Sequence, residues 1–293
     1  MHVNRLVPTL FILIAAAGAV RTPASEPRLG QPVAAPARTV RVAAASDLKF
    51  ALDEAISRLK RLDASIEVEA AYGSSGNFHA QLRQHAPFDL YLSADAVYPR
   101  DLVRSGIGLE RDLFTYAVGR LVVWVPHRST LPIERDHLRT LVGARRVAIA
   151  NPRHAPYGRA AEAALRREGI WNQIQPRLVL GENIAQTAQF VQSGAADVGL
   201  VAKSLVVAPA MAGAGRYWEI PAHEHAPLVQ GGLVLPWASS REAALRVRDY
   251  LLSVEGRKLL QAFGFGLPDD SSRLSASPGE SSPRAWSREP KVN

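Results

Sequence analysis

The sequence predicts an α/β protein with two lobes, in which each lobe is a mostly parallel sheet flanked by helices. The first observation behind this prediction is that short apolar runs alternate along the chain with segments of helical period. The second is that the alternation runs twice, once before about Tyr116 and once after Leu121. The third is that the 293 residues include no cysteine, so the fold depends on a hydrophobic core without disulfides.

The first half of the alternation begins with a short apolar strand at residues 40–45. Residues 47–61 carry apolar side chains at helical spacing and predict an amphipathic helix. A strand at residues 66–71, a short helix at residues 77–85 and a strand at residues 88–92 follow. This order of elements is typical of a parallel sheet with helical connections.

The second half of the chain repeats the alternation with clearer helix ends. Gly169 and Gly194 follow two helical segments and are typical of helix C-termini. We expect strands at residues 121–125, 146–150, 177–180, 197–202 and 228–236, and helices at residues 157–168, 183–193 and 242–263.

The two ends of the chain differ in composition from the part between them. Arg5 precedes an apolar run that ends in the small residues 17–19, an order of parts typical of a secretory signal peptide. A bilayer-spanning helix needs about 20 apolar residues, and this run is shorter. We therefore expect a cleaved signal peptide at residues 1–19, a linker at residues 20–38, a disordered tail at residues 269–293, and export to the periplasm.

The formal net charge of +8 is compatible with an anionic partner. Lysine and arginine are scattered, however, with no run of five and no interleaving with aromatic residues. A solvated basic surface is the simpler interpretation, and we expect no nucleic-acid partner.

Four predicted strand-to-helix junctions carry small or hydrogen-bonding residues. They lie at Ser46, at residues 74–76, at residues 154–158 and at residues 181–184. In open α/β sheets ligands bind at the carboxyl ends of strands, where helix N-termini offer free backbone N–H groups. Taken singly, Ser46 and Ser75 are explained as ordinary helix caps. Taken together, the junctions predict an anion site built from neutral donors.

Other chemistries lack one or more of the residues they require. The run at residues 73–76 is one residue short of a nucleophile elbow, and no glycine-rich loop precedes a Lys-Ser or Lys-Thr pair. His223 and His225 are two residues apart and could share a metal if their segment were extended, but no carboxylate or third histidine with convincing spacing completes a metal site. We expect no enzyme activity, no cofactor and no free metal cation. A serine-dependent hydrolase using Ser75, with His79 or His154 as base, stays open as a remote alternative.

At the same junctions the sequence resembles the periplasmic molybdate-binding proteins of ABC transporters. The resemblance rests on Ala43-Ala44-Ala45-Ser46, on the block from Tyr72-Gly73-Ser74-Ser75-Gly76 to Ala86-Pro87-Phe88-Asp89 and Leu92-Ser93-Ala94-Asp95, and on Asn151-Pro152 with His154-Ala155-Pro156-Tyr157-Gly158. It extends from about residue 40 to residue 267. It implies the type II periplasmic-binding architecture, in which the chain crosses twice between the lobes.

The resemblance implies boundaries and partners. We expect the crossings near residues 117–120 and 229–231. Lobe I then comprises residues 39–118 and 231–268, and lobe II residues 119–230. The implied ligand is molybdate or tungstate, the implied partner is a membrane permease, and a monomer is expected. The same scaffold binding sulfate, a phosphonate or an organic acid is the main alternative.

Roles in the implied site are carried over residue by residue. Ser46 and Ser75 would each donate a hydroxyl and a backbone N–H, and Tyr157 and Ile184 would donate backbone N–H groups. Asp47 would contribute its N–H, and we expect its carboxylate to turn away from the anion and cap the following helix. Some relatives place a binding tyrosine where this chain has Ala202, so the Tyr157 hydroxyl is expected to replace it.

Overall fold

The computed structural model describes residues 38–268, with the side chain of Arg135 left out. The predicted signal peptide, the predicted tail and nearly all of the predicted linker lie outside the described residues. All described residues belong to one compact unit of the chain. No helix among them is long and apolar enough to cross a bilayer.

The first sheet has the strand order β2-β1-β3-β10-β4. Strand β1 (Arg38–Ala45) pairs in parallel with β2 (Ile66–Gly73) and with β3 (Leu90–Ser93). Strand β10 (Leu228–Val234) runs antiparallel to both β3 and β4 (Leu113–Gly119). Four strands therefore point the same way and β10 alone is reversed.

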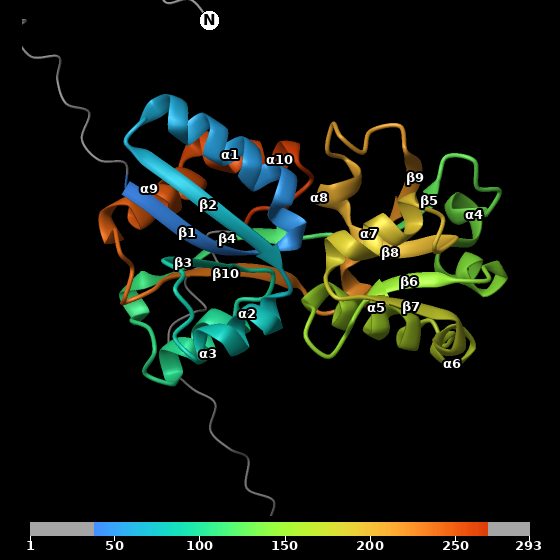
Figure 1. Ribbon diagram of the computed structural model, residues 1–293. Helices are drawn as coiled ribbons and strands as arrows, with labels where there is room; N and C mark the ends of the chain where they lie inside the picture. The colour runs from blue at the N-terminus through green and yellow to red at the C-terminus, as the bar shows by residue number, and fades with distance from the viewer. Residues whose placement is uncertain (1–37, 269–293) are drawn as a thin grey trace, which may run out of the picture. The chain divides into compact units, whose positions relative to one another are not determined.

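Helices cover both faces of this sheet (Figure 1). One face packs against α1 (Lys49–Leu62), α9 (Arg241–Leu252) and α10 (Val254–Ala262) around an apolar cluster. The other packs against α2 (Ser75–Leu82) and α3 (Val97–Arg104) around a smaller cluster. The valines of β1 point to the first cluster and Ala43 to the second, as the two-residue period of a strand requires. We call this sheet with its helices lobe I.

The second sheet repeats the arrangement with the order β7-β6-β8-β5-β9. Strand β6 (Val147–Ala150) pairs in parallel with β7 (Leu178–Gly181) and β8 (Val198–Ala202). Strand β5 (Leu121–Pro126) is antiparallel to β8 and to β9 (Gly215–Glu219). The predicted fold class, two lobes with mostly parallel sheets, is thus confirmed, with one reversed strand in each sheet.

We call the second sheet with its helices lobe II, and its core surrounds the buried Trp124. The helices of this lobe are α4 (Ile133–Asp136), α5 (Pro156–Arg167), α6 (Trp171–Ile174), α7 (Ile184–Gln192) and α8 (Lys203–Val206). Short 3₁₀ turns complete the described chain: η1 (Ser46–Leu48), η2 (Glu110–Asp112), η3 (His137–Gly143), η4 (Gln175–Arg177) and η5 (Ala222–Glu224).

The chain crosses between the lobes at Arg120, between β4 and β5, and again through residues 220–227, between β9 and β10. The second crossing therefore precedes the expected residues 229–231, which lie within β10. Gly231 and Gly232 of β10 allow close packing of the strand against its neighbours. A Cβ at Gly231 would lie 2.9 Å from Ala96, one at Gly232 would lie 2.3 Å from the Phe114 ring, and the register shifts between Gln230 and Gly231.

Candidate anion-binding site

The starts of four helical segments enclose a small cavity between the lobes. The cavity has a volume of about 10 Å³, far below the range of about 300–1,000 Å³ typical of pockets for drug-sized molecules. All five predicted site residues line it, and none of its described lining residues is lysine, arginine or histidine. The lining comprises Ala45, Ser46, Asp47, Gly73, Ser74, Ser75, Ala94, Ala155, Pro156, Tyr157 and Ile184.

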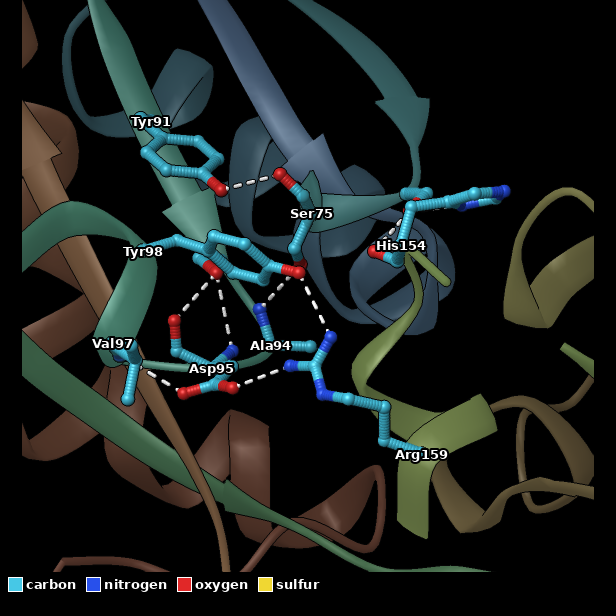
Figure 2. A network of polar contacts seen from close by, with 10 residues as sticks. Ser75, Tyr91, Ala94, Asp95, Val97, Tyr98, His154 and Arg159 are labelled. Atoms are coloured by element: carbon cyan, nitrogen blue, oxygen red, sulfur yellow. Dashed lines mark hydrogen bonds and ion pairs between the residues drawn. The ribbon is translucent and has the colours of Figure 1, made fainter. Parts of the chain in front are cut away.

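Ser75 is the first residue of α2 and is buried. Its hydroxyl accepts a hydrogen bond from the Ala94 amide at 3.0 Å, and its carbonyl accepts one from the Tyr91 hydroxyl at 2.7 Å (Figure 2). Because the hydroxyl acts as an acceptor in this contact, its own proton is left to donate to an anion.

Ile184 and Tyr157 bring helix starts of lobe II to the same cavity. Ile184 is the first residue of α7, and Asn183 caps that helix by accepting from the Gln186 amide at 3.0 Å. Tyr157 follows Pro156, which opens α5 and has no N–H group. The Tyr157 amide is therefore the first donor that α5 offers to a ligand at its N-terminus.

The Ser46 hydroxyl makes a contact across the lobes that the sequence did not indicate. It donates to Asn183 Oδ1 at 3.1 Å and accepts from the Ala185 amide at 3.3 Å. In this arrangement the hydroxyl joins η1 of lobe I to the start of α7 in lobe II. The sequence placed Asn183 at this junction, as is typical of an N-cap before an apolar helix, but it did not indicate the contact with Ser46.

The Asp47 side chain does not behave as expected. It is 1% exposed and makes no capping hydrogen bond in η1. Its Oδ2 instead accepts hydrogen bonds from the Tyr157 hydroxyl, at 3.0 Å, and from the Gln230 side-chain amide. The expectation that this carboxylate caps a helix is wrong, because two buried donors from α5 and β10 compete for it. The Tyr157 hydroxyl, expected to replace a tyrosine at Ala202, is likewise directed at Asp47.

Burial raises the pKa of Asp47 to about 6, while the hydrogen bonds from Gln230 and Tyr157 and weaker contacts with nearby backbone amides lower it. The Asp47 carbonyl also accepts from the Ser204 hydroxyl of α8 at 2.8 Å. Gly119, beside the first crossing, leaves space for this cluster, because a Cβ there would lie 2.3 Å from the Tyr157 hydroxyl oxygen. Asp47 therefore contacts two helices of lobe II and the strand that follows the second crossing.

A second set of contacts joins the lobes beside α2. The Gly76 amide and the Ser74 hydroxyl both donate to the His154 carbonyl, at 2.9 and 2.7 Å. Arg159 of α5 forms an ion pair with Asp95 at 2.6 Å and donates to the Tyr98 hydroxyl at 2.8 Å (Figure 2). We call Arg159, Asp95 and Tyr98 the rim cluster. Sequence reasoning missed its role, since only the fold brings these residues together.

The contacts of His154 and His79 test whether either histidine could act as the base in the hydrolase alternative. His154 Nδ1 lies 2.9 Å from the Ser74 hydroxyl, and His79 bonds Asp101 at 2.9 Å. In the described part of the chain neither histidine hydrogen-bonds Ser75. Since the Ser74 hydroxyl gives its proton to the His154 carbonyl, the ring acts as a donor to it and not as an activating base.

His223 and His225 do not form a shared site. His223 lies 3.1 Å from Glu224, and His225 bonds the Ala226 carbonyl at 2.8 Å. Within residues 38–268 there is no group of three or more histidine, cysteine or acidic side chains that could hold a metal ion.

The fold and this cavity define a class of protein. Residues 40–266 match the family described as bacterial extracellular solute-binding protein, and the chain belongs to that family.

Two similar relatives are molybdate-binding proteins. The molybdate-binding protein ModA of Rhodobacter capsulatus is 35% identical over 198 residues, covering 68% of this chain and 77% of the relative. The ModA of Azotobacter vinelandii is 32% identical over 234 residues, covering 80% and 92%. The resemblance seen in the sequence is thereby confirmed.

Solved structures agree with this assignment. The periplasmic molybdate-binding protein of Azotobacter vinelandii superposes with a TM-score of 0.74 at 29% identity, covering 78% of this chain and all of that chain. The sulfate-binding protein SubI of Mycobacterium tuberculosis H37Rv gives a TM-score of 0.64 at 16% identity, covering 82% and 90%. At 16% identity, the likeness to SubI concerns the fold alone.

Proposed function

We propose that this protein captures molybdate or tungstate in the cavity between its lobes and delivers it to the permease of an ABC transporter. The observation that carries the proposal is the convergence of Ser46, Ser75, Tyr157 and Ile184, each at a helix start, on one small cavity. The molybdate-binding relatives support the choice of ligand.

The chemistry of the cavity suits a tetrahedral dianion. Backbone N–H groups at helix starts and the Ser75 hydroxyl are neutral donors, and the helix dipoles favour negative charge there. Each hydrogen bond to a charged group contributes about 1.5–3 kcal/mol, so several of them give tight binding without a buried cation. The small volume then favours compact anions over larger solutes.

The remaining expectations follow from this role. We propose that the protein works in the periplasm after removal of residues 1–19, as a monomer, and without enzyme activity or a cofactor. We also propose lobe boundaries at the two crossings, between β4 and β5 and between β9 and β10. Family membership supports the extracellular location.

Calorimetric titration of the exported chain with molybdate, tungstate, sulfate and phosphate tests the proposal. We expect molybdate and tungstate to bind with micromolar or tighter dissociation constants and sulfate to bind more weakly. Ser75→Ala removes a donor and should weaken molybdate binding by about 10- to 100-fold, or about 1.4–2.8 kcal/mol.

The matched control is Ser57→Ala, since Ser57 is an exposed serine on α1 and far from the lining of the cavity in the fold. It should leave affinity unchanged. Heat with sulfate and none with molybdate would assign the cavity to another anion. Equal loss of affinity in the two serine variants would contradict the placement of the site.

A further inference from the structure

Asp47 poses a problem for an anion site. Among the described residues that line the cavity, it alone carries a formal charge near neutral pH when ionised, and that charge is negative. It is 1% exposed, so little water screens it. An ionised Asp47 would repel any dianion held in the same cavity.

The two oxygens of the Asp47 carboxyl group differ in their surroundings. Oδ2 accepts hydrogen bonds from the Tyr157 hydroxyl and from the Gln230 amide. Oδ1 is buried and has no hydrogen-bond partner among the described residues. A proton on this carboxyl would therefore reside on Oδ1 and would turn an acceptor into a donor.

The groups around Asp47 supply no compensating charge. Tyr157 on α5 and Tyr116 on β4 stay protonated, because burial holds the pKa of each well above its usual range. Gln230 on β10 and Ser204 on α8 are neutral. The environment of Asp47 is thus polar and uncharged, which favours the protonated form.

Lys49 and Lys203, which lie on helices packed against η1, each pair with an acidic side chain other than Asp47. Lys49 on α1 lies 3.2 Å from Asp53, which also accepts from the Tyr72 hydroxyl of β2. Lys203 on α8 lies 2.7 Å from Glu219. These pairs leave Asp47 without a cation of its own.

We propose that Asp47 takes up one proton when an oxyanion binds, and that its protonated Oδ1 then donates to the ligand while Oδ2 keeps its contacts with Tyr157 and Gln230. The inference rests on the proposed function and adds to it the protonation state of the anion that the site prefers. Water or buffer supplies the proton, the carboxylate becomes a carboxylic acid, and the proton returns to solvent on release. The raised pKa of the carboxyl group, about 6, makes this uptake easier.

The protonation state of Asp47 determines which anions the site prefers. A protonated Asp47 is a donor and suits an anion with no acidic hydrogen at neutral pH, such as molybdate or tungstate. An ionised Asp47 would instead accept a hydrogen bond from an anion that keeps a hydrogen, such as hydrogen phosphate. Asp47 therefore acts as a specificity-determining residue.

Calorimetry of the exported chain in two buffers with different ionisation enthalpies, such as Tris and HEPES, measures the proton uptake directly. For molybdate we expect uptake of close to one proton per anion at pH 8 and about half a proton at pH 6. The affinity should fall about tenfold for each pH unit above about 7. This measurement on the unaltered chain needs no variant.

Two variants sharpen the test. Asp47→Asn keeps the shape and should bind molybdate without proton uptake at pH 8, whereas the exposed Asp249→Asn should behave as the unaltered chain. Tyr157→Phe removes a hydrogen bond that favours the charged form and so raises the pKa of the free Asp47 carboxyl group further. Proton uptake at pH 6 should therefore be smaller in this variant than in the unaltered chain.

Molybdate binding without proton uptake at pH 8, or the same uptake in Asp47→Asn, would overturn the role of Asp47 and leave the proposed function standing. Tighter binding of hydrogen phosphate than of molybdate would overturn it as well. Absence of heat with every anion between pH 6 and pH 8 would contradict the proposed function and this inference with it.

Discussion

The Tyr157 hydroxyl donates to Oδ2 of Asp47 at 3.0 Å, and this bond joins the start of α5 in lobe II to η1, the turn that precedes α1, in lobe I. Both residues line the cavity between the lobes. This bond, one of several contacts between the lobes, therefore also forms part of the cavity lining. Changes that disturb this contact should alter closure of the lobes and anion affinity together.

Gly119→Ala tests the space that this contact requires. An added Cβ would lie 2.3 Å from the Tyr157 hydroxyl oxygen, so Tyr157 must shift. We expect a loss of about 1–3 kcal/mol in the free energy of unfolding and roughly tenfold weaker molybdate binding. Urea unfolding and calorimetry measure the two effects. Gly143→Ala is the control, because the nearest atom to its added Cβ is 3.9 Å away; an equal effect there would contradict the account.

The free energy of unfolding should depend on pH through Asp47. Its pKa is raised from 3.8 to about 6, so the folded state binds the proton more tightly than the unfolded state. The resulting stabilisation is complete below pH 3.8 and is lost as pH rises through about 6. Relative to Asp47→Asn, the unaltered chain should lose roughly 2 kcal/mol between pH 4 and pH 7. Urea titrations at several pH values measure this difference, and a constant difference would contradict it.

Asp89 should matter for stability and not for binding. It is 4% exposed, and its carboxylate accepts from the Arg41 amide and from both the amide and the hydroxyl of Ser239. Asp89→Ala leaves these donors without their acceptor and should cost about 2–4 kcal/mol of unfolding free energy. Thermal unfolding checks this, with the exposed Asp249→Ala as control. A large change in molybdate affinity of the folded variant would argue against this separation.

Arg159→Gln tests the rim cluster. The ion pair of Arg159 with Asp95 is partly exposed, so we expect it to contribute only about 0–1 kcal/mol. Molybdate should dissociate a few-fold faster from the variant, and high salt should reduce the difference. Stopped-flow measurements at low and high salt give the dissociation rate. Arg104→Gln, in an exposed pair with Asp101, should leave dissociation unchanged.

The sequence predicted the parts of the fold that local patterns specify. The alternation of strands and helices and the four helix starts at the cavity follow from apolar period, caps and small residues. Strands β4 and β9 were not predicted, because their residues do not alternate clearly and their pairing depends on distant partners.

The same reasoning explains the errors in the site. The sequence neighbours of Asp47 predicted a helix cap, but its partners Tyr157 and Gln230 lie 110 and 183 residues away. The second crossing was expected near residues 229–231, whereas these residues lie within β10, where Gly231 and Gly232 accommodate Ala96 and Phe114. Both features depend on contacts between residues far apart in the sequence, and local sequence patterns do not reveal such contacts.

The location of the anion is the central claim, and anomalous X-ray scattering from crystals grown with tungstate tests it most directly. The account predicts one strong tungsten peak in the cavity, within hydrogen-bonding reach of the Ser75 hydroxyl and the backbone amides of Tyr157 and Ile184. A tungsten peak elsewhere, or none in crystals of a protein that binds tungstate in solution, would contradict it.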